Sequence, residues 1–194
     1  MQSTVAVPFG AGDRREVFLR RVTRWQAERD RENLADLHVA AYTTHSGNDF
    51  GARLTFLDRL VRDTQEPGFD LVMAEGNTAQ GYGYGFRVGR DGAWWDGFVG
   101  TLPGALVELT ARGGVYALTE LMVLPPYRRA GVATKILKEL LANCGAILAT
   151  ALVSPDNSMA QSVYRAWGWT VIGQRRPSLG VPPQDVLVQL VPQR

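Results

Sequence analysis

The amino-acid sequence predicts a single mixed α/β domain. Strand-like and helix-like segments alternate along the 194 residues, and no repeat, low-complexity segment or linker divides them. An apolar fraction of 45% and a charged fraction of 21% are those of an ordinary globular protein, and a chain of this length can bury one sizeable core. We expect residues 1–14 to be a loose leader and residues 15–194 to be the domain.

In the first half of the chain we expect a strand, two helices and a β-hairpin. Residues 16–23 have the composition of a strand, and residues 26–42 carry apolar side chains at helical spacing. A polar break, TTHSGND, precedes a second helix, which the sequence EPGF ends. The strand-like runs 69–76 and 80–89 are separated by the turn GNT, which predicts a hairpin.

The second half is predicted to alternate strands with helices. Residues 87–114 are rich in glycine and predict no clear element. The run 115–124 predicts a strand and the pattern over roughly 130–143 predicts a helix. Residues 146–153 are apolar almost throughout, which is typical of a strand covered on both faces.

The last part of the chain is predicted to form one more helix and two strands. That helix should be capped near Asp156 or Asn157 and should end at Gly168, and residues 170–176 and 185–191 should be strands. The predicted order of elements is therefore β-α-α-β-β-β-α-β-α-β-β.

The composition argues against several classes of partner. The net charge is only +2 and the arginines are spread along the chain, so we expect neither nucleic acid nor a membrane surface as a partner. No apolar run approaches the roughly 18 residues that span a bilayer, and the N-terminus lacks the pattern of a secretory signal. Because a lone cysteine excludes an internal disulfide, we expect a reducing, cytoplasmic location.

Neither a metal site nor a nucleophilic cysteine is expected. The chain has two histidines and one cysteine, and His38, His45 and Cys144 have no metal-ligand spacing. Cys144 also has no evident histidine partner that could activate it.

The most informative stretch is PPYRRAGVAT, residues 125–134, which joins a predicted strand to a predicted helix. The first N–H groups of a helix lack intrahelical partners and lie at the positive end of its dipole, so they can bind a phosphate. Gly131 would let an anion approach the backbone, and Arg128 and Arg129 could add charge. Alternatively, proline, arginine and glycine are simply common in loops, and this pattern alone leaves both interpretations open.

Two other phosphate-binding motifs are excluded. The chain contains no GxxxxGK[ST] sequence, so it is not a P-loop nucleotide hydrolase. The glycines of GYGYG, residues 81–85, lack the spacing of a dinucleotide-binding turn and lie within a predicted strand. They all lie on one face of that strand, so we expect them to permit twisting or close packing.

The segment LTELMVLPPYRRAGVATKIL resembles the acyl-CoA-binding segment of the GNAT superfamily of N-acyltransferases, in which a strand ends in a [QR]xxGx[GA] turn that opens a helix. A later segment resembles the NxxAxxxYxxxG[FW] helix of the same family. The order of elements also agrees with the family over residues 16–190, apart from residues 87–114. The residues that match the two motifs are Arg128, Gly131, Ala133, Asn157, Ala160, Tyr164, Gly168 and Trp169.

The resemblance implies the GNAT fold, an α/β (α+β) architecture whose central twisted sheet is mixed, mostly antiparallel and flanked by helices. It also implies acetyl-CoA as the acyl donor, with its pyrophosphate on the turn and its pantetheine arm along the preceding strand. In the family, the position of Arg129 is often glycine and that of Ala130 is often basic; these departures leave the backbone donors in place. The residues implied in cofactor binding are Met122, Val123, Arg128, Arg129, Ala130, Gly131, Val132, Ala133, Thr134, Asn157, Ala160 and Tyr164.

Glu120 is the candidate catalytic base. An amine with a pKa of ~10.4 is almost fully protonated at neutral pH, so a base near it assists transfer. Glu120 lies within an apolar strand, on the predicted face of Leu118 and Met122, where a carboxylate is costly unless it is paired or functional. The resemblance implies a glutamate that acts through a water; the alternative is a structural glutamate paired with an arginine, for example one of the first strand.

Tyr164 is the candidate acid. The resemblance implies that it protonates the sulfur of CoA and that Asn157 hydrogen-bonds the pantetheine arm. The alternative is a core tyrosine in an aromatic cluster with Trp167 and Trp169.

The predicted function is acetyl transfer from acetyl-CoA to a primary amine of a small molecule, by direct attack in a ternary complex. A longer acyl-CoA, a protein or peptide amine, or a CoA-binding module without turnover are the alternatives. Trp94 and Trp95 are expected to line an acceptor pocket or to fill the core, and His45 is a candidate acceptor contact. A homodimer is one assembly that the resemblance allows.

Overall fold

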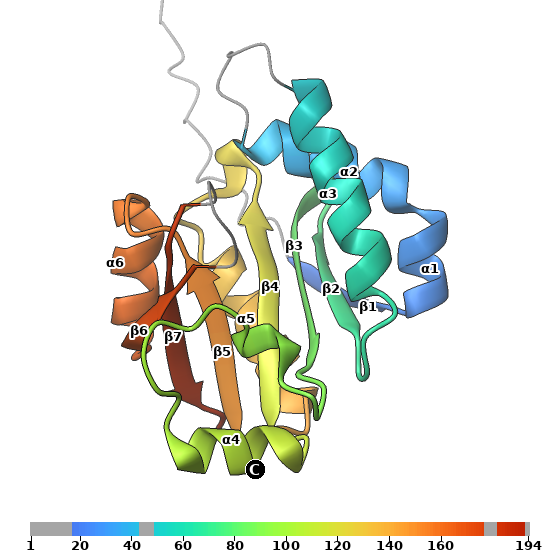
Figure 1. Ribbon diagram of the computed structural model, residues 1–194. Helices are drawn as coiled ribbons and strands as arrows, with labels where there is room; N and C mark the ends of the chain where they lie inside the picture. The colour runs from blue at the N-terminus through green and yellow to red at the C-terminus, as the bar shows by residue number, and fades with distance from the viewer. Residues whose placement is uncertain (1–16, 43–48, 177–181, 193–194) are drawn as a thin grey trace, which may run out of the picture.

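The computed structural model describes residues 17–42, 49–176 and 182–192, so the predicted leader lies outside the described residues. Within them, the chain forms a seven-stranded sheet in the order β1-β2-β3-β4-β5-β7-β6, and only β4 and β5 pair in parallel. Helices cover the sheet on both faces (Figure 1). The predicted fold class, a mixed and mostly antiparallel sheet flanked by helices, is confirmed.

Every strand and helix predicted from the sequence is present, with changes to the first helix and one additional helix. The strands are β1 (Phe18–Val22), β2 (Asp70–Glu75), β3 (Ala79–Arg87), β4 (Val115–Val123), β5 (Leu148–Val153), β6 (Thr170–Arg175) and β7 (Gln184–Leu190). The helices are α1 (Arg24–Arg29), α2 (Arg31–Tyr42), α3 (Asp49–Asp63), α4 (Gly104–Ala111), α5 (Val132–Asn143) and α6 (Ser158–Ala166), with short 3-10 turns η1 (Ala93–Trp95) and η2 (Pro125–Tyr127).

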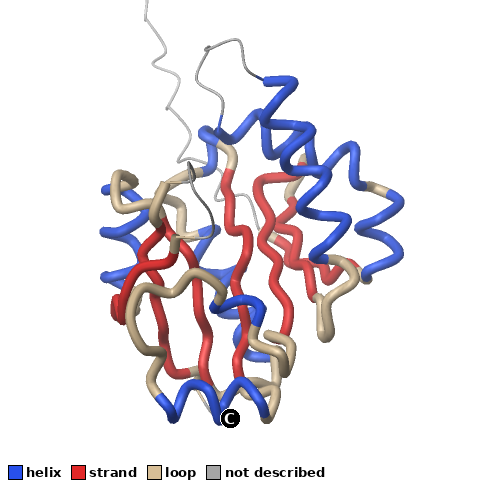
Figure 2. The backbone as a smooth tube through the Cα atoms, in the orientation of Figure 1, coloured by secondary structure: helices blue, strands red, loops and turns tan. Residues whose placement is uncertain are grey.

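The two faces of the sheet carry separate cores. On one face, α5 and α6 pack against alternate side chains of the strands, including the fully buried Val72 and Tyr116. On the other face, α1, α2 and α3 cover β2 and β3 through residues such as Phe56 and Tyr82. The remaining strands on that face are covered by η1 and α4, and Figure 2 shows the irregular segment between these two elements crossing the sheet.

The glycines of GYGYG in β3 allow α5 and β4 to approach closely, as expected. A Cβ on Gly83 would lie 2.9 Å from a methyl group of Ile136 in α5. On Gly85 it would lie 2.2 Å from the carbonyl oxygen of Ala117 in β4. Both distances are shorter than real Cβ contacts, so any larger residue would push these elements apart.

The single helix predicted over residues 26–42 is wrong, because the chain forms two helices that separate at Asp30. Asp30 leaves the helical conformation with φ −95° and ψ 13°. The first helix also begins earlier than predicted, since Thr23 and Gln26 form a capping box. The side chain of Thr23 accepts from the N–H of Gln26 at 3.3 Å, and the side chain of Gln26 accepts from the N–H of Thr23 at 2.9 Å.

Helix α4 was not predicted from the sequence. It follows Pro103 and has no side-chain cap, so the usual signal of a helix start is missing. Trp95 is buried beside it, and its indole N–H donates to the hydroxyl of Thr110 at 3.0 Å. Trp95 therefore fills the core, which was one of the two alternatives for it. None of the helices in the described ranges is long and apolar enough to cross a membrane.

Strands β4 and β5 part toward their carboxyl ends. Their parallel ladder joins Val115–Leu118 to Leu148–Ala151 and extends no further along the described residues of either strand. On the outer sides the sheet continues, because β3 pairs with β4 as far as Val123 and β7 pairs with β5 as far as Val153. The sheet is therefore open between the two parallel strands.

Candidate active site

A cavity of 280 Å³ occupies the opening between β4 and β5. Its walls come from α2, α3, β4, β5 and α6, which are far apart in the sequence. Glu120 and Tyr164, the two residues predicted to take part in proton transfer, both line it. The other lining residues are His38, Tyr42, Arg59, Thr119, Leu121, Leu152, Val153, Ser154, Asn157 and Ala160.

A β-bulge at Thr119 sets the direction of Glu120. Adjacent residues of β3 pair with Leu118 and Glu120, so Thr119 is an extra residue in β4. Because the extra residue reverses the alternation of faces, Glu120 points with Met122 toward α2 and α3, whereas Leu118 packs on the α5 face. The predicted shared face is confirmed for Met122 and wrong for Leu118.

Glu120 is buried and surrounded by three groups from α2 and α3. The hydroxyl of Tyr42 donates to its Oε1 at 2.7 Å, and the guanidinium of Arg59 donates to its Oε2. The Nδ1 of His38 lies 3.4 Å from Oε2, close enough for an ion pair when the ring is protonated but without the alignment of a hydrogen bond. The arginine partner considered from the sequence is present, but it comes from α3 rather than from the first strand.

These contacts keep Glu120 ionised despite its burial. Burial by itself raises the pKa of Glu120, but His38, Arg59 and the hydrogen bond from Tyr42 outweigh it and hold the pKa below its usual range. A carboxyl whose pKa is lowered on folding adds stability above its unfolded pKa and loses this contribution as the pH falls through its folded pKa. Because its pKa is lowered, Glu120 is a carboxylate at neutral pH.

Replacing Arg59 by methionine is expected to destabilise the protein by about 3 kcal/mol near neutral pH, because a buried carboxylate loses its cationic partner. The loss should shrink at about pH 5, since Glu120 then takes up a proton more readily in the variant than in the wild type. Urea unfolding at both pH values measures the difference.

The matched control for this prediction is Arg53→Met on the same helix. Arg53 pairs with Glu32 and Asp36 at the surface, where ion pairs contribute little. Equal losses in the two variants, independent of pH, would contradict a special role of the pair between Arg59 and Glu120.

Tyr164 packs in an aromatic cluster and also lines the cavity. Its ring lies edge-to-face against Trp167 and Trp169, with centroid distances of 5.6 and 5.1 Å. Burial, and then the negative charge of Glu120, raise the pKa of Tyr164. The aromatic cluster considered as an alternative is thus present, and the phenol keeps its proton at neutral pH.

Asn157 is the N-cap of α6 and is one of the two residues predicted for that position. Its Oδ1 accepts from the N–H of Ala160 at 3.0 Å. Its Nδ2 donates to none of the described residues, and the side chain lines the cavity. Because the oxygen is occupied, Asn157 offers its amide N–H groups to a ligand.

The turn before α5 exposes backbone donors. The N–H of Lys135 donates to the oxygen of Gly131 at 3.1 Å, whereas those of Val132, Ala133 and Thr134 donate to no residue that the structure describes. Gly131 is the N-cap, with φ +76°, and no atom lies within 4 Å of the place that its Cβ would take. The start of α5 therefore presents three donors beside open space.

The two arginines of this turn differ in their surroundings. Arg129 is exposed and has φ +62°, a left-handed conformation that costs a non-glycine residue about 1 kcal/mol or more. Arg128 holds the turn in place: its guanidinium donates to the carbonyl oxygen of Val123 at 3.0 Å and to that of Ala41 at 2.6 Å. These bonds tie the turn to the ends of β4 and α2.

At the open edge of β4, the backbone N–H groups of Val123 and Met122 point in opposite directions. The N–H of Leu124 donates to the carbonyl oxygen of Gln80 in β3, at 2.9 Å. By the alternation of an antiparallel ladder, the N–H of Met122 also points toward β3 and that of Val123 points the other way. The N–H of Val123 is therefore directed to the side from which β5 has diverged.

Two larger cavities also occur in the described part of the chain. One of 890 Å³ adjoins the Glu120 cavity, with which it shares Arg59, Thr119 and Leu152, and Trp94 lines it. Of the two tryptophans, Trp94 thus lines a pocket whereas Trp95 fills the core.

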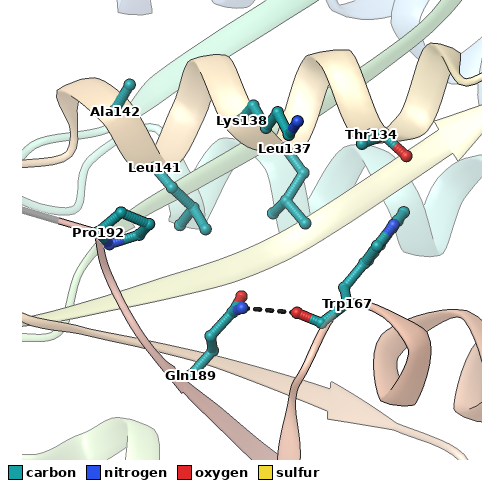
Figure 3. A pocket seen from close by; sticks show the side chains of 8 residues that line it. All are labelled: Thr134, Leu137, Lys138, Leu141, Ala142, Trp167, Gln189 and Pro192. Atoms are coloured by element: carbon teal, nitrogen blue, oxygen red, sulfur yellow. Dashed lines mark hydrogen bonds between the residues drawn. The ribbon is translucent and has the colours of Figure 1, made fainter.

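The other cavity is an apolar hollow of 400 Å³ on the α5 face (Figure 3). Leu137 and Leu141 point into it from α5, opposite Trp167 and Gln189. The side-chain amide of Gln189 donates to the carbonyl oxygen of Trp167 at 2.6 Å. This hollow shares no lining residue with the Glu120 cavity, so we assign it no part in the chemistry.

The remaining candidates from the sequence lie elsewhere. Cys144 is buried after α5, where its thiol contacts the carbonyl oxygen of Leu141. His45 lies outside the described residues. No group of three or more potential metal ligands occurs among the residues that the structure describes. His38, Tyr42 and Arg59, in contrast, line the cavity although no role was predicted for them.

Several solved structures share this fold, and an N-acetyltransferase is among them. PaiA N-acetyltransferase from Thermoplasma acidophilum, in complex with coenzyme A, matches with a TM-score of 0.60 and 14% identity over 90% of this chain and 99% of that one. PH1933 from Pyrococcus horikoshii OT3 matches with a TM-score of 0.62 and 16% identity over 90% and 98%. YncA from Salmonella typhimurium, solved with its cofactor acetyl-CoA, matches with a TM-score of 0.51 and 14% identity over 92% and 95%.

The chain thus shares its fold, including the open sheet and the donor-lined turn before α5, with a class of proteins that the match to a family model identifies. The family model described as the acetyltransferase (GNAT) family matches residues 31–169, which is most of the chain. This protein belongs to the GNAT acetyltransferase family. No curated protein matches the sequence.

Proposed function

We propose that this protein is an N-acetyltransferase that moves an acetyl group from acetyl-CoA to a primary amine of a small molecule, by direct attack in a ternary complex. The observation that carries the proposal is the cavity between the parted strands, in which Glu120 and Tyr164 approach from β4 and α6. Membership of the GNAT acetyltransferase family supports it.

The start of α5 fits the pyrophosphate of CoA. The unpaired N–H groups of Val132, Ala133 and Thr134 are donors at the positive end of the helix, and Gly131 leaves them accessible. The exposed guanidinium of Arg129 could add a charge-assisted contact.

The opening between the strands fits the pantetheine arm. The N–H of Val123 and the side-chain amide of Asn157 supply donors, and the small side chain of Ala160 lines the same cavity as Asn157. The contacts assigned to Met122, Arg128 and Ala130 stay predictions. When bound, acetyl-CoA would supply an acetyl group on a thioester, which a neutral amine can attack.

Glu120 and His38 are well placed to act together as the base. The oxygens of Glu120 are engaged by Tyr42 and Arg59, so Glu120 is not a free acceptor for a proton. The ring of His38 lies between Phe56 and Tyr42, at centroid distances of 4.5 and 4.7 Å, with Nδ1 toward Glu120. We place the proton of the amine on Nε2 of His38, where the carboxylate compensates the resulting charge.

Tyr164 would supply the second proton. Its hydroxyl stays protonated at neutral pH because its pKa is raised, and its ring is fixed by the aromatic cluster. In this scheme the phenol donates its proton to the departing sulfur, and solvent returns a proton to the phenolate afterwards.

A thiol-release assay with a panel of amines tests the proposed function. Free CoA that appears only in the presence of an amine, together with a product heavier by one acetyl group, would support it. If no amine or peptide releases CoA although calorimetry detects CoA binding, the chain is a binding module instead. Longer acyl-CoA donors in the same assay test the alternative donor.

Replacing His38 by alanine is expected to lower kcat by about 100-fold while the affinity for CoA changes little. Because the variant leaves a ring-sized space between Phe56 and Tyr42, added imidazole should restore part of the rate. Tyr42→Phe is the control, since it removes another contact of Glu120 without removing a base. A loss that imidazole does not reverse, equal in both variants, would indicate that His38 only supports Glu120.

A further inference from the structure

The 890 Å³ cavity is placed to hold the part of the acceptor that does not react. It shares Arg59, Thr119 and Leu152 with the cavity of Glu120 and Tyr164, so one molecule can occupy both. Its other walls come from α3, from the segment between β3 and η1, and from β6. The inference that follows rests on the proposed function and concerns the substrate of the same site.

The described residues of this cavity include as many unpaired cations as unpaired anions, so a preference for an anionic ligand depends on particular side chains and not on the net charge of the lining. Arg59 is neutralised by Glu120. Asp63 accepts a hydrogen bond from the hydroxyl of Tyr84 at 3.1 Å, and burial raises its pKa to about 6, so its negative charge is partly lost in mildly acidic solution. The charged lining residues that form no ion pair with any described residue are Arg62, Arg90 and Arg175 on the basic side and Asp63, Glu66 and Asp91 on the acidic side.

Arg175 is the unusual cation of this set because it is half-buried. Its Nε donates to the carbonyl oxygen of Asp96 at 2.8 Å, and its two Nη groups donate to no described residue. Burial lowers the pKa of Arg175, and the negative charge of Asp96 offsets this only in part. A partly desolvated cation of this kind is stabilised when a ligand supplies an anion.

Trp94 adds a second unsatisfied donor on the same wall. The guanidinium of Arg175 lies 5.9 Å from the centre of the Trp94 ring, and the buried indole N–H has no acceptor in the described structure. Two backbone bonds hold this wall together: the N–H of Arg176 donates to Gly97 at 2.8 Å, and that of Val99 donates to Gln174 at 2.8 Å. The guanidinium of Arg175 and the ring of Trp94 are therefore held near each other before any ligand binds, although the indole N–H itself is closed off from solvent.

We propose that the acceptor carries an anionic oxygen group in addition to its primary amine, with the anion bound by Arg175 beside the ring of Trp94. The amine then lies in the adjoining cavity near His38 and Glu120. A guanidinium binds carboxylate and phosphate oxygens through paired, charge-assisted hydrogen bonds, so both groups share the required chemistry. Diamines and neutral amines lack it.

Amines that differ only in this group test the proposal. With acetyl-CoA fixed, kcat/KM is compared for γ-aminobutyrate against n-butylamine, for phosphoethanolamine against ethanolamine, and for putrescine as a dication. The anionic member of each pair should be preferred by about 10- to 100-fold, the value of one or two charge-assisted bonds. The carboxylate and phosphate pairs show which anion the site accepts.

Variants at Arg175 assign the preference to this wall. Arg175→Gln should remove it by slowing the anionic amines while the neutral amines keep their rates, which also shows that the variant is folded. Arg175→Lys retains a charge and should retain part of the preference. Arg176→Gln, an exposed neighbour outside the cavity, should change nothing.

Several results would overturn the proposal. Equal or better use of n-butylamine or putrescine excludes an anion subsite, as does an Arg175→Gln variant that slows neutral and anionic amines alike. If no amine releases CoA, the transferase assignment fails, and this result does not decide whether the anion subsite exists. Calorimetric titration with γ-aminobutyrate and n-butylamine then decides the subsite, because Arg175-dependent binding of the carboxylate supports it and indistinguishable binding refutes it.

Discussion

Replacing Gly131 by glutamate should abolish binding of CoA. Any side chain at this position enters the open space beside the N–H groups of Val132, Ala133 and Thr134, and a carboxylate there repels a diphosphate. Juxtaposed like charges cost several kcal/mol, so affinity measured by calorimetry should fall by at least about 100-fold. The variant should also show no acetyl transfer at ordinary concentrations of acetyl-CoA.

The glycine that follows α4 provides the matched control for this experiment. Gly113 has φ +70°, close to the +76° of Gly131, and no atom lies within 4 Å of its missing Cβ either. Gly113→Glu therefore imposes a similar backbone strain at a position outside the proposed cofactor site. Both variants should lose comparable stability, and only Gly131→Glu should lose affinity. Unchanged affinity in Gly131→Glu would refute the anion site at α5.

The sequence predicted the positions of those site residues that depend only on residues next to them in the chain. Gly131 and the donors after it follow from a strand, a turn and a helix in immediate succession, and Asn157 follows from the cap of a short helix. In both places the chemistry is fixed by local backbone geometry, which a pattern of a few residues determines. The same kind of information was present but overlooked in the capping box of Thr23 and Gln26.

Parts of the site that depend on contacts between distant elements could not be predicted in the same way. The bulge at Thr119 is a property of the pairing between β3 and β4, so simple alternation placed Leu118 and Glu120 on one face when they lie on opposite faces. Arg59 approaches Glu120 only because α3 packs against α2 on this face of the sheet, and no spacing in the sequence links these two residues.

A weak signal was available for the other two partners of Glu120. His38 and Tyr42 are four residues apart, so a helix places them on one face, and their polar atoms stand among apolar neighbours. The sequence alone did not indicate which element this face of the helix would contact. Helix α4 illustrates the opposite difficulty, because its start carries no capping residue and its existence depends on packing against Trp95.

Replacing Tyr164 by phenylalanine should lower kcat by about 100-fold or more while the affinity for CoA stays nearly unchanged. The variant keeps the ring that packs on Trp167 and Trp169, so unfolding should be little affected. Tyr116→Phe is the matched control: that hydroxyl is buried on the α5 face, lines neither cavity around Glu120, and has no hydrogen-bond partner in the described structure. Comparable rates for wild type and Tyr164→Phe would remove Tyr164 as the acid.

The pH dependence of kcat gives this assignment a second, independent test. An acid must carry its proton to act, and the raised pKa of Tyr164 keeps it protonated to a higher pH than an ordinary tyrosine, whose pKa is about 10. If Tyr164 donates to the sulfur, kcat in the wild type should not fall on its account until the pH is well above that value. Glu120 is the charge responsible for part of the shift, so Glu120→Gln should move any such alkaline decline to lower pH, whereas Tyr164→Phe should abolish it. An alkaline decline that persists in Tyr164→Phe would have to come from another group.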